Sequence, residues 1–160
     1  MKNGKNKKMS FENFIKYWVP VMIWLVFIFW MSTNAFSSKK TALVIGPLLV
    51  ALMPAITPSK LRLLHMVIRK AAHITEYFVL GMLLFRGFRG TEKERKPWRW
   101  AVFSLMAVSL YALSDEFHQT FVPSRGVELS DVGIDIVAGG VALAISVLFY
   151  RLKRSGRVRL

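Results

Sequence analysis

Residues 17–36 read YWVPVMIWLVFIFWMSTNAF, a run of twenty residues without a charge. At about 1.5 Å per residue, a helix of this length crosses the hydrocarbon core of a bilayer, which is about 30 Å thick. The whole chain is also strongly apolar, because 54% of its 160 residues are hydrophobic and its mean hydropathy is +0.39. This composition argues against a disordered chain and against a water-soluble enzyme core, and it predicts a membrane protein.

A cleaved secretory signal is the alternative for this first run, since Thr33 and Ala35 loosely resemble the small residues of a cleavage site. However, Trp18, Trp24 and Trp30 are bulky for the apolar part of a signal peptide. We therefore expect the run to persist as a spanning helix. Cleavage would leave the later topology unchanged.

The charge of the chain indicates membrane orientation and not nucleic-acid binding. It carries 23 Lys and Arg against nine Asp and Glu, a net charge of +14. These basic residues flank the apolar runs and form no groove-reading motif, so we expect contacts with the lipid bilayer and no nucleic-acid partner. The absence of cysteine excludes a disulfide scaffold, a thiol nucleophile and a Cys-ligated metal site.

Three further spanning helices are expected, over residues 64–85, 98–119 and 130–150. Ser130 is the expected N-cap of the last, because a serine hydroxyl accepts a hydrogen bond from a free backbone N–H at a helix start. Pro97 is tolerated in the first turn of the middle helix. The sequence therefore predicts an all-α membrane protein with four transmembrane helices.

Residues 41–57 are apolar as well, but Gly46, Pro47 and Pro54 interrupt them. If this segment spanned the membrane, ten basic residues would lie inside and thirteen outside. If it does not span, sixteen lie inside and seven outside, as the positive-inside rule favours. We therefore expect a Pro-broken re-entrant or interfacial segment on the outer side.

This topology divides the chain into three parts and fixes its orientation. A basic tail (1–16), a transmembrane domain (17–150) and a second basic tail (151–160) follow one another. Both termini are expected in the cytoplasm, as parts of a multi-pass protein of the cytoplasmic membrane.

Ionisable side chains from three of the predicted helices reach one depth in this topology. Counted from the inner interface at about 1.5 Å per residue, four of them lie about 15–24 Å above it, and two lie about one turn further out. Residues three or four apart share a helix face, so each helix presents one polar stripe. The stripes comprise His73, Glu76 and Tyr77; Asp115, His118 and Gln119; and Asp131 with Asp135.

This outer layer contains more negative than positive charge. Its carboxylates are Glu76, Asp115, Glu116, Asp131 and Asp135, and its cations are Arg69, Lys70 and Arg125. A protonated histidine, a protonated acid or a divalent cation would supply the difference. A structural ion-pair network is the alternative, since charges inside a membrane need partners whatever their purpose. Such a network would balance its charges more closely, so we favour a functional site, with Glu116, Asp131 and Asp135 as candidate metal ligands.

Two other features accompany the polar layer. The loop over residues 119–129 presents Arg125, which suits bidentate recognition of phosphate or carboxylate, although a salt bridge to Glu128 or Asp131 fits its spacing equally well. The last helix continues with small residues that favour close helix packing. They are Ala138, Gly139, Gly140, Ala142 and Ala144.

At these residues the sequence resembles the VanZ-like family. The resemblance rests on RKAAHITEY at 69–77, SDEFHQ at 114–119, VPSR at 122–125 and DVGID at 131–135 with Gly139, and it covers about residues 17–150. It implies a small bacterial multi-span membrane protein, in a family named for a member associated with low-level teicoplanin resistance. A relationship of this family to lipid head-group enzymes of the phosphatidylserine synthase kind has been suggested.

The first candidate function is an enzyme that acts on the phosphate-linked head group of a phospholipid or an undecaprenyl-linked cell-wall precursor at the outer face. His73 or His118 would act as nucleophile or general base, because imidazole titrates near working pH. Glu76 and Asp115 would orient the imidazoles or bind metal. The candidate substrate-binding residues are Arg69, Lys70, Tyr77, Gln119 and Arg125.

The second candidate is a non-enzymatic membrane module. The same polar cup would then bind a lipid-linked precursor, a lipoglycopeptide or a partner protein. Ion transport is disfavoured, because the inner half of the predicted spans lacks ionisable residues strung along its depth.

Overall fold

The computed structural model describes residues 10–33, 38–92, 96–121 and 129–156, and within these ranges the chain is 89% helical without a strand. Five helices follow one another along the chain. They are α1 (Phe11–Met31), α2 (Ser38–Leu52), α3 (Pro58–Thr91), α4 (Pro97–Gln119) and α5 (Leu129–Arg154). The predicted all-α class is confirmed.

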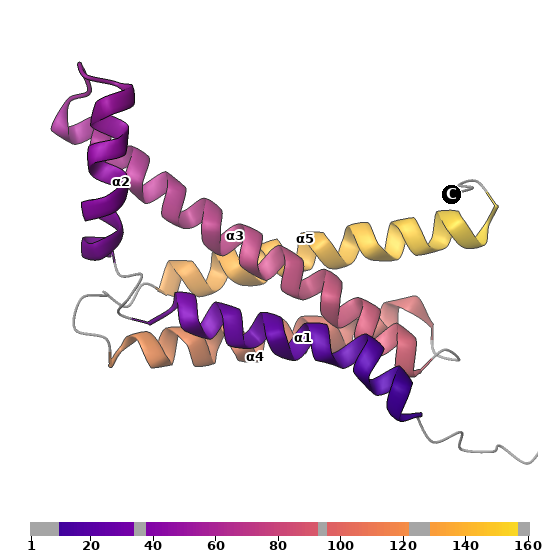
Figure 1. Ribbon diagram of the computed structural model, residues 1–160. Coiled ribbons are helices and arrows are strands. Elements are labelled where there is room, and N and C mark those ends of the chain that lie inside the picture. Colours follow the sequence, from indigo (N-terminus) through magenta and orange to yellow (C-terminus); the bar gives the residue numbers. More distant parts are fainter. Residues whose placement is uncertain (1–9, 34–37, 93–95, 122–128, 157–160) are drawn as a thin grey trace, which may run out of the picture.

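Four of the helices form a bundle around α3 (Figure 1). α3 packs against α1, α4 and α5, and α4 packs against α5. α1 begins, α3 ends, α4 begins and α5 ends at the same end of the bundle, so α1 and α4 run opposite to α3 and α5 (Figure 1). The helices α3 and α5 therefore cross while running in the same direction.

A glycine-rich contact brings α3 and α5 together. A Cβ atom built on Gly81 would lie 2.9 Å from the Gly139 carbonyl oxygen and 3.2 Å from the Ala142 Cβ. A Cβ on Gly139 would in turn lie 2.7 Å from Val108 of α4. Small residues thus let the α3 and α5 backbones approach closely and let the Val108 side chain of α4 pack onto α5, as the sequence predicted for this part of the last helix. Gly140 differs, because a Cβ there would meet nothing within 4 Å.

The helix bounds differ from the predicted ones mainly at polar ends. α3 starts six residues before the predicted helix and ends six after it, because Lys60 and Arg62 are good helix formers although they break the apolar pattern. Pro58 occupies its first turn, where a missing N–H costs nothing. The N-cap prediction for Ser130 is wrong, since Ser130 lies inside α5. α1 is instead capped by Ser10, whose hydroxyl accepts a hydrogen bond from the Asn13 N–H at 3.3 Å.

The apolar segment 41–57 is largely helical and stands apart from the bundle. α2 runs through Gly46 and Pro47 without a break and ends before Pro54. At 15 residues it is about 22 Å long, shorter than a bilayer core. It packs against the first half of α3 (Figure 1) and leaves apolar side chains such as Leu43 and Leu52 exposed.

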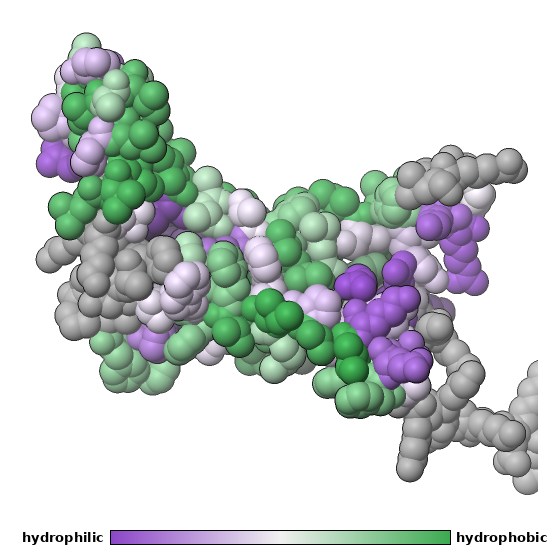
Figure 2. Space-filling model, viewed as in Figure 1, coloured by the Kyte–Doolittle hydropathy of each residue, from purple (hydrophilic) through white to green (hydrophobic). Residues whose placement is uncertain are grey.

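Among the described residues, α1 and α5 are the two helices clearly long and apolar enough to cross a membrane, where the sequence predicted four. α3 falls short because Arg69, Lys70 and Glu76 lie in its middle, and α4 has Asp115 and Glu116 near its end. Figure 2 shows a mostly hydrophobic surface over α2 and the middle of the bundle, with hydrophilic residues gathered where α1 begins and α5 ends. Large apolar side chains are exposed on α1, α4 and α5, as expected of a lipid-facing surface.

Candidate functional site

The polar stripes of α3, α4 and α5 meet inside the half of the bundle in which α1 ends and α5 begins. His73 and Glu76 are each 9% exposed, and their partners on α4 and α5 are more deeply buried. These partners are Asp115, Glu116, Gln119, Asp131 and Asp135. Burial of so many ionisable groups is costly unless each is paired or serves a ligand, so their pairing decides what the site can do.

Matched turns of α3 and α5 pair acids with bases. The Lys70 Nζ donates to Asp131 Oδ1 at 2.6 Å, and Arg69 lies 3.5 Å from the other oxygen of the same carboxylate. One turn further in, the His73 Nδ1 lies 3.6 Å from Asp135 Oδ1. The parallel course of the two helices produces this repetition, because each turn of α3 faces the corresponding turn of α5.

Hydrogen bonds also connect the polar layer to α1 and to its C-cap, Ser32. The Gln119 Nε2 donates to the Ser32 Oγ and to Asp115 Oδ2, each at 3.0 Å. The Trp24 indole donates to the backbone carbonyl of Glu76 at 2.9 Å. Neither Ser32 nor Trp24 was predicted for the site, because an uncharged residue in an apolar run gives no signal of convergence.

Several buried polar atoms of this layer have no hydrogen-bond partner among the described residues. They are the His73 Nδ1, the Tyr77 hydroxyl, Asp115 Oδ1 and Asp135 Oδ1. A buried polar group left unpaired costs about 1–3 kcal/mol. The His73 Nδ1 and Asp135 Oδ1 face each other at 3.6 Å, so the Tyr77 hydroxyl and Asp115 Oδ1 are the atoms of this group that are left for water or a polar ligand.

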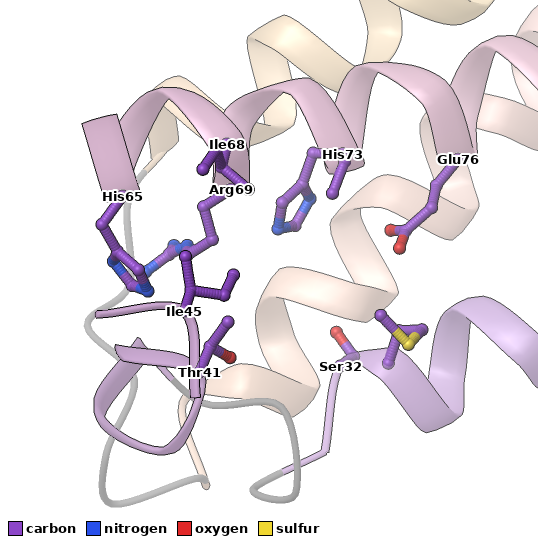
Figure 3. A pocket seen from close by; sticks show the side chains of 10 residues that line it. Ser32, Thr41, Ile45, His65, Ile68, Arg69, His73 and Glu76 are labelled. Atoms are coloured by element: carbon purple, nitrogen blue, oxygen red, sulfur yellow. The ribbon is translucent and has the colours of Figure 1, made fainter. Parts of the chain in front are cut away.

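A cavity of about 190 Å³ opens beside this layer, between α3, the end of α1 and α2. His65, Arg69, His73 and Glu76 extend into it from one side of α3, and Ser32 faces them from the end of α1 (Figure 3). The rest of the lining is mainly apolar. It comprises Met31, Thr41, Ile45, Ile68 and Ala72. His65 and Thr41 were not predicted, because their part in the lining depends on α2 folding back onto α3.

The remaining predicted site residues lie away from the cavity. His118 stacks its ring on Phe29 of α1, with 4.6 Å between ring centroids. Tyr77 is fully buried, and its ring centre lies 6.4 Å from that of Tyr111. Glu116 is buried on α4 and does not line the cavity. Arg125 lies outside the described residues.

The predicted metal ligands do not gather into one cluster. No group of three His, Asp or Glu side chains close enough to hold a metal ion is present in the described part of the chain. Asp131 faces Arg69 and Lys70, whereas Asp135 faces His73. The divalent cation therefore stays a prediction from the sequence.

An all-helical chain with an apolar surface, two helices able to cross a bilayer and a polar layer inside its bundle is a helical membrane protein. It belongs to the VanZ/LLP1 family, whose sequence profile matches residues 17–150. This match includes every described residue of the polar layer. No curated protein and no solved structure matches the chain.

Proposed function

We propose that this VanZ-family protein is a four-span protein of the bacterial cytoplasmic membrane, with both termini in the cytoplasm. The shared end at which α1 begins and α5 ends supports this topology, because four helices in alternation return the chain to its starting side. Sixteen of the 23 basic residues then lie inside. In this topology α2 lies at the outer surface as an interfacial or re-entrant helix.

The proposed activity is hydrolysis or transfer of a phosphate-linked lipid head group in the outer cavity. One observation carries it: His73 lines the cavity beside Arg69, while its Nδ1 faces Asp135 at 3.6 Å. A histidine with one ring nitrogen held by a carboxylate has the other available for proton transfer or attack. The substrate class is a phospholipid or an undecaprenyl-linked cell-wall precursor.

The surrounding residues have separate roles in this proposal. Asp135 positions the His73 ring through the Nδ1 atom that faces it. Arg69 contributes positive charge to the phosphate oxygens, with Lys70 next to it in the chain. Arg125, which lies outside the described residues, is a further candidate from the sequence alone. Glu76 faces the cavity as a second acid or base. Tyr77, Asp115 and Gln119 are buried within the polar layer and do not line the cavity.

His73 is a better candidate for the reacting imidazole than His118. Both were predicted from the stripes, but His118 packs on Phe29 and does not line the cavity. The two histidines therefore provide a matched pair of substitutions within one protein. His73→Ala removes the proposed base or nucleophile, whereas His118→Ala removes an imidazole of the same size outside the cavity.

The test is a lipid-product assay on the purified chain, with phosphatidylglycerol and an undecaprenyl-pyrophosphate-linked precursor as substrates. Each is incubated with Mg²⁺ and, separately, with EDTA. We expect product from the wild type, a loss of about 100-fold or more for His73→Ala, and a change of less than about threefold for His118→Ala. Absence of product under every condition would reject the enzymatic proposal.

A binding module is the second candidate, and the apolar part of the lining favours it. Met31, Ile45 and Ile68 give the cavity a surface suited to hydrocarbon beside the charged groups. In this case the wild type and His73→Ala retain the lipid-linked precursor equally, and neither releases product.

Family membership supports a resistance-related role, which we propose as the cellular consequence of either activity. The wild-type gene expressed in a susceptible bacterium should raise the teicoplanin concentration that inhibits growth. His73→Ala should lose this effect if catalysis underlies it and keep it if binding alone does.

A further inference from the structure

A second hollow lies at the opposite end of the bundle from the polar layer. It is an apolar groove of about 510 Å³ between α4 and α5. Trp98 lines it from α4, and Gly140, Ala144 and Arg151 line it from α5. On α5 the groove begins at Gly140, five residues after Asp135 of the polar layer, and extends to Arg151.

The groove exists because small residues face it without packing against a neighbouring helix. A Cβ on Gly140 would meet no atom within 4 Å, whereas one on the adjacent Gly139 would collide with Val108. Gly139 is therefore needed for helix contact and Gly140 is not. Gly140 and Ala144 leave room along α5 for an elongated apolar group.

Positive charge surrounds one end of the groove. Arg151 lines both the groove and an adjoining hollow that contains Tyr150 and Arg154. Neither arginine forms an ion pair with a carboxylate in the described ranges of the chain. Trp98, 51% exposed, lies at the same end, where an indole suits the boundary between hydrocarbon and water.

We propose that the α4–α5 groove binds an anionic glycerophospholipid, with one acyl chain along Gly140 and Ala144 and the phosphate held by Arg151 and Arg154. A guanidinium group can donate two parallel hydrogen bonds to phosphate oxygens. A groove lined by apolar side chains suits an acyl chain. A second copy of this chain fits less well, because a dimer across the groove would bring two sets of the same arginines to one level. The site is independent of the outer cavity and needs no activity there.

The experiment measures lipid bound to the purified full-length chain by native mass spectrometry. The probes are palmitoyl-oleoyl phosphatidylglycerol and phosphatidylcholine with the same acyl chains. Gly140→Leu fills the groove, and Gly133→Leu is its control, since Gly133 is equally unobstructed on α5 but outside the groove. Arg151→Gln is compared with Lys153→Gln, which removes the same charge from the same turn without touching either hollow.

We expect Gly140→Leu and Arg151→Gln to weaken phosphatidylglycerol binding by about tenfold or more, and the two controls to change it by less than about twofold. Phosphatidylcholine should bind weakly to every variant. Ala144→Leu provides a second groove-filling change, and circular dichroism establishes that each variant is folded. Equal binding of both lipids, or wild-type binding by both groove-filling variants, would overturn the proposal. A dimer that Gly140→Leu dissociates would assign the groove to self-association instead.

Discussion

Asp131 and Asp135 lie one turn apart on α5, but they face different side chains and we expect them to have different roles. Asp131 accepts a hydrogen bond from Lys70 and lies near Arg69, whereas Asp135 Oδ1 has no hydrogen-bond partner among the described residues. Asp131→Asn removes the charge that two cations face, and we expect it to lower the free energy of unfolding by about 1–3 kcal/mol, after allowance for partial exposure of the cations. Thermal unfolding in detergent measures the change. Asp135→Asn should shift Tm much less, and equal shifts would contradict this division.

His73→Gln tests the reacting residue without removing its bulk. Glutamine keeps approximate size and hydrogen bonding but does not titrate in the working range. We expect normal expression, a change in stability within about 1 kcal/mol, and a loss of lipid turnover of about 100-fold or more. Turnover at the wild-type rate would exclude His73 as base or nucleophile. Failure to accumulate folded protein would show that His73 serves the structure.

The convergence of His73 and Asp135 was predictable because residue spacing and depth along two helices are sufficient to match their levels. The separation of His118 from the cavity was not, since its ring direction depends on the packing of α1 against α4. Ser32 and His65 were missed for a related reason. Each reaches the site only after chain segments distant in sequence have packed together.

At the level of whole helices, Gly81 controls how closely α3 and α5 approach. A methyl group there would lie 2.9 Å from a backbone oxygen of Gly139, so Gly81→Ala forces the two backbones apart. We expect a loss of about 1–3 kcal/mol. Gly133→Ala is the matched control, because its methyl group meets no atom within 4 Å and alanine favours a helix by up to about 1 kcal/mol. Comparable unfolding temperatures for the two variants would argue against the close contact.

Helices were predicted most accurately where apolar periodicity and a proline coincide. α4 begins at Pro97 and ends at Gln119, within one residue of the expected range. The start of α3 was misplaced because a pattern of apolar residues ends where Lys60 and Arg62 begin, although both favour a helix. The sequence also did not predict that α2 continues through Pro47, since a proline within a helix is normally disruptive.

For the whole molecule, the proposed topology is testable because the chain has no natural cysteine. Single cysteines at Ser124, Thr91 and Ser155 would mark the outer loop, the inner loop and the C-terminal end. In intact cells an impermeant thiol reagent should label the cysteine at 124 and spare the other two. All three should react after the membrane is permeabilised. Labelling at 91 in intact cells would instead support a fifth span over residues 41–57.

Because α3 and α5 run in the same direction and meet at two levels, the number of residues between these levels is constrained in both helices. The two helices meet at Gly81 with Gly139 and, further out, at His73 with Asp135. One residue inserted into α3 between these levels would rotate His73 by about 100° around the helix axis while the glycine contact stayed in place. The imidazole would then face lipid or another helix. A matching residue inserted into α5 would not restore the pair, because the two parallel helices would turn their facing sides in the same sense. Only insertions of about seven residues, close to two whole turns, in both helices would keep His73 facing Asp135.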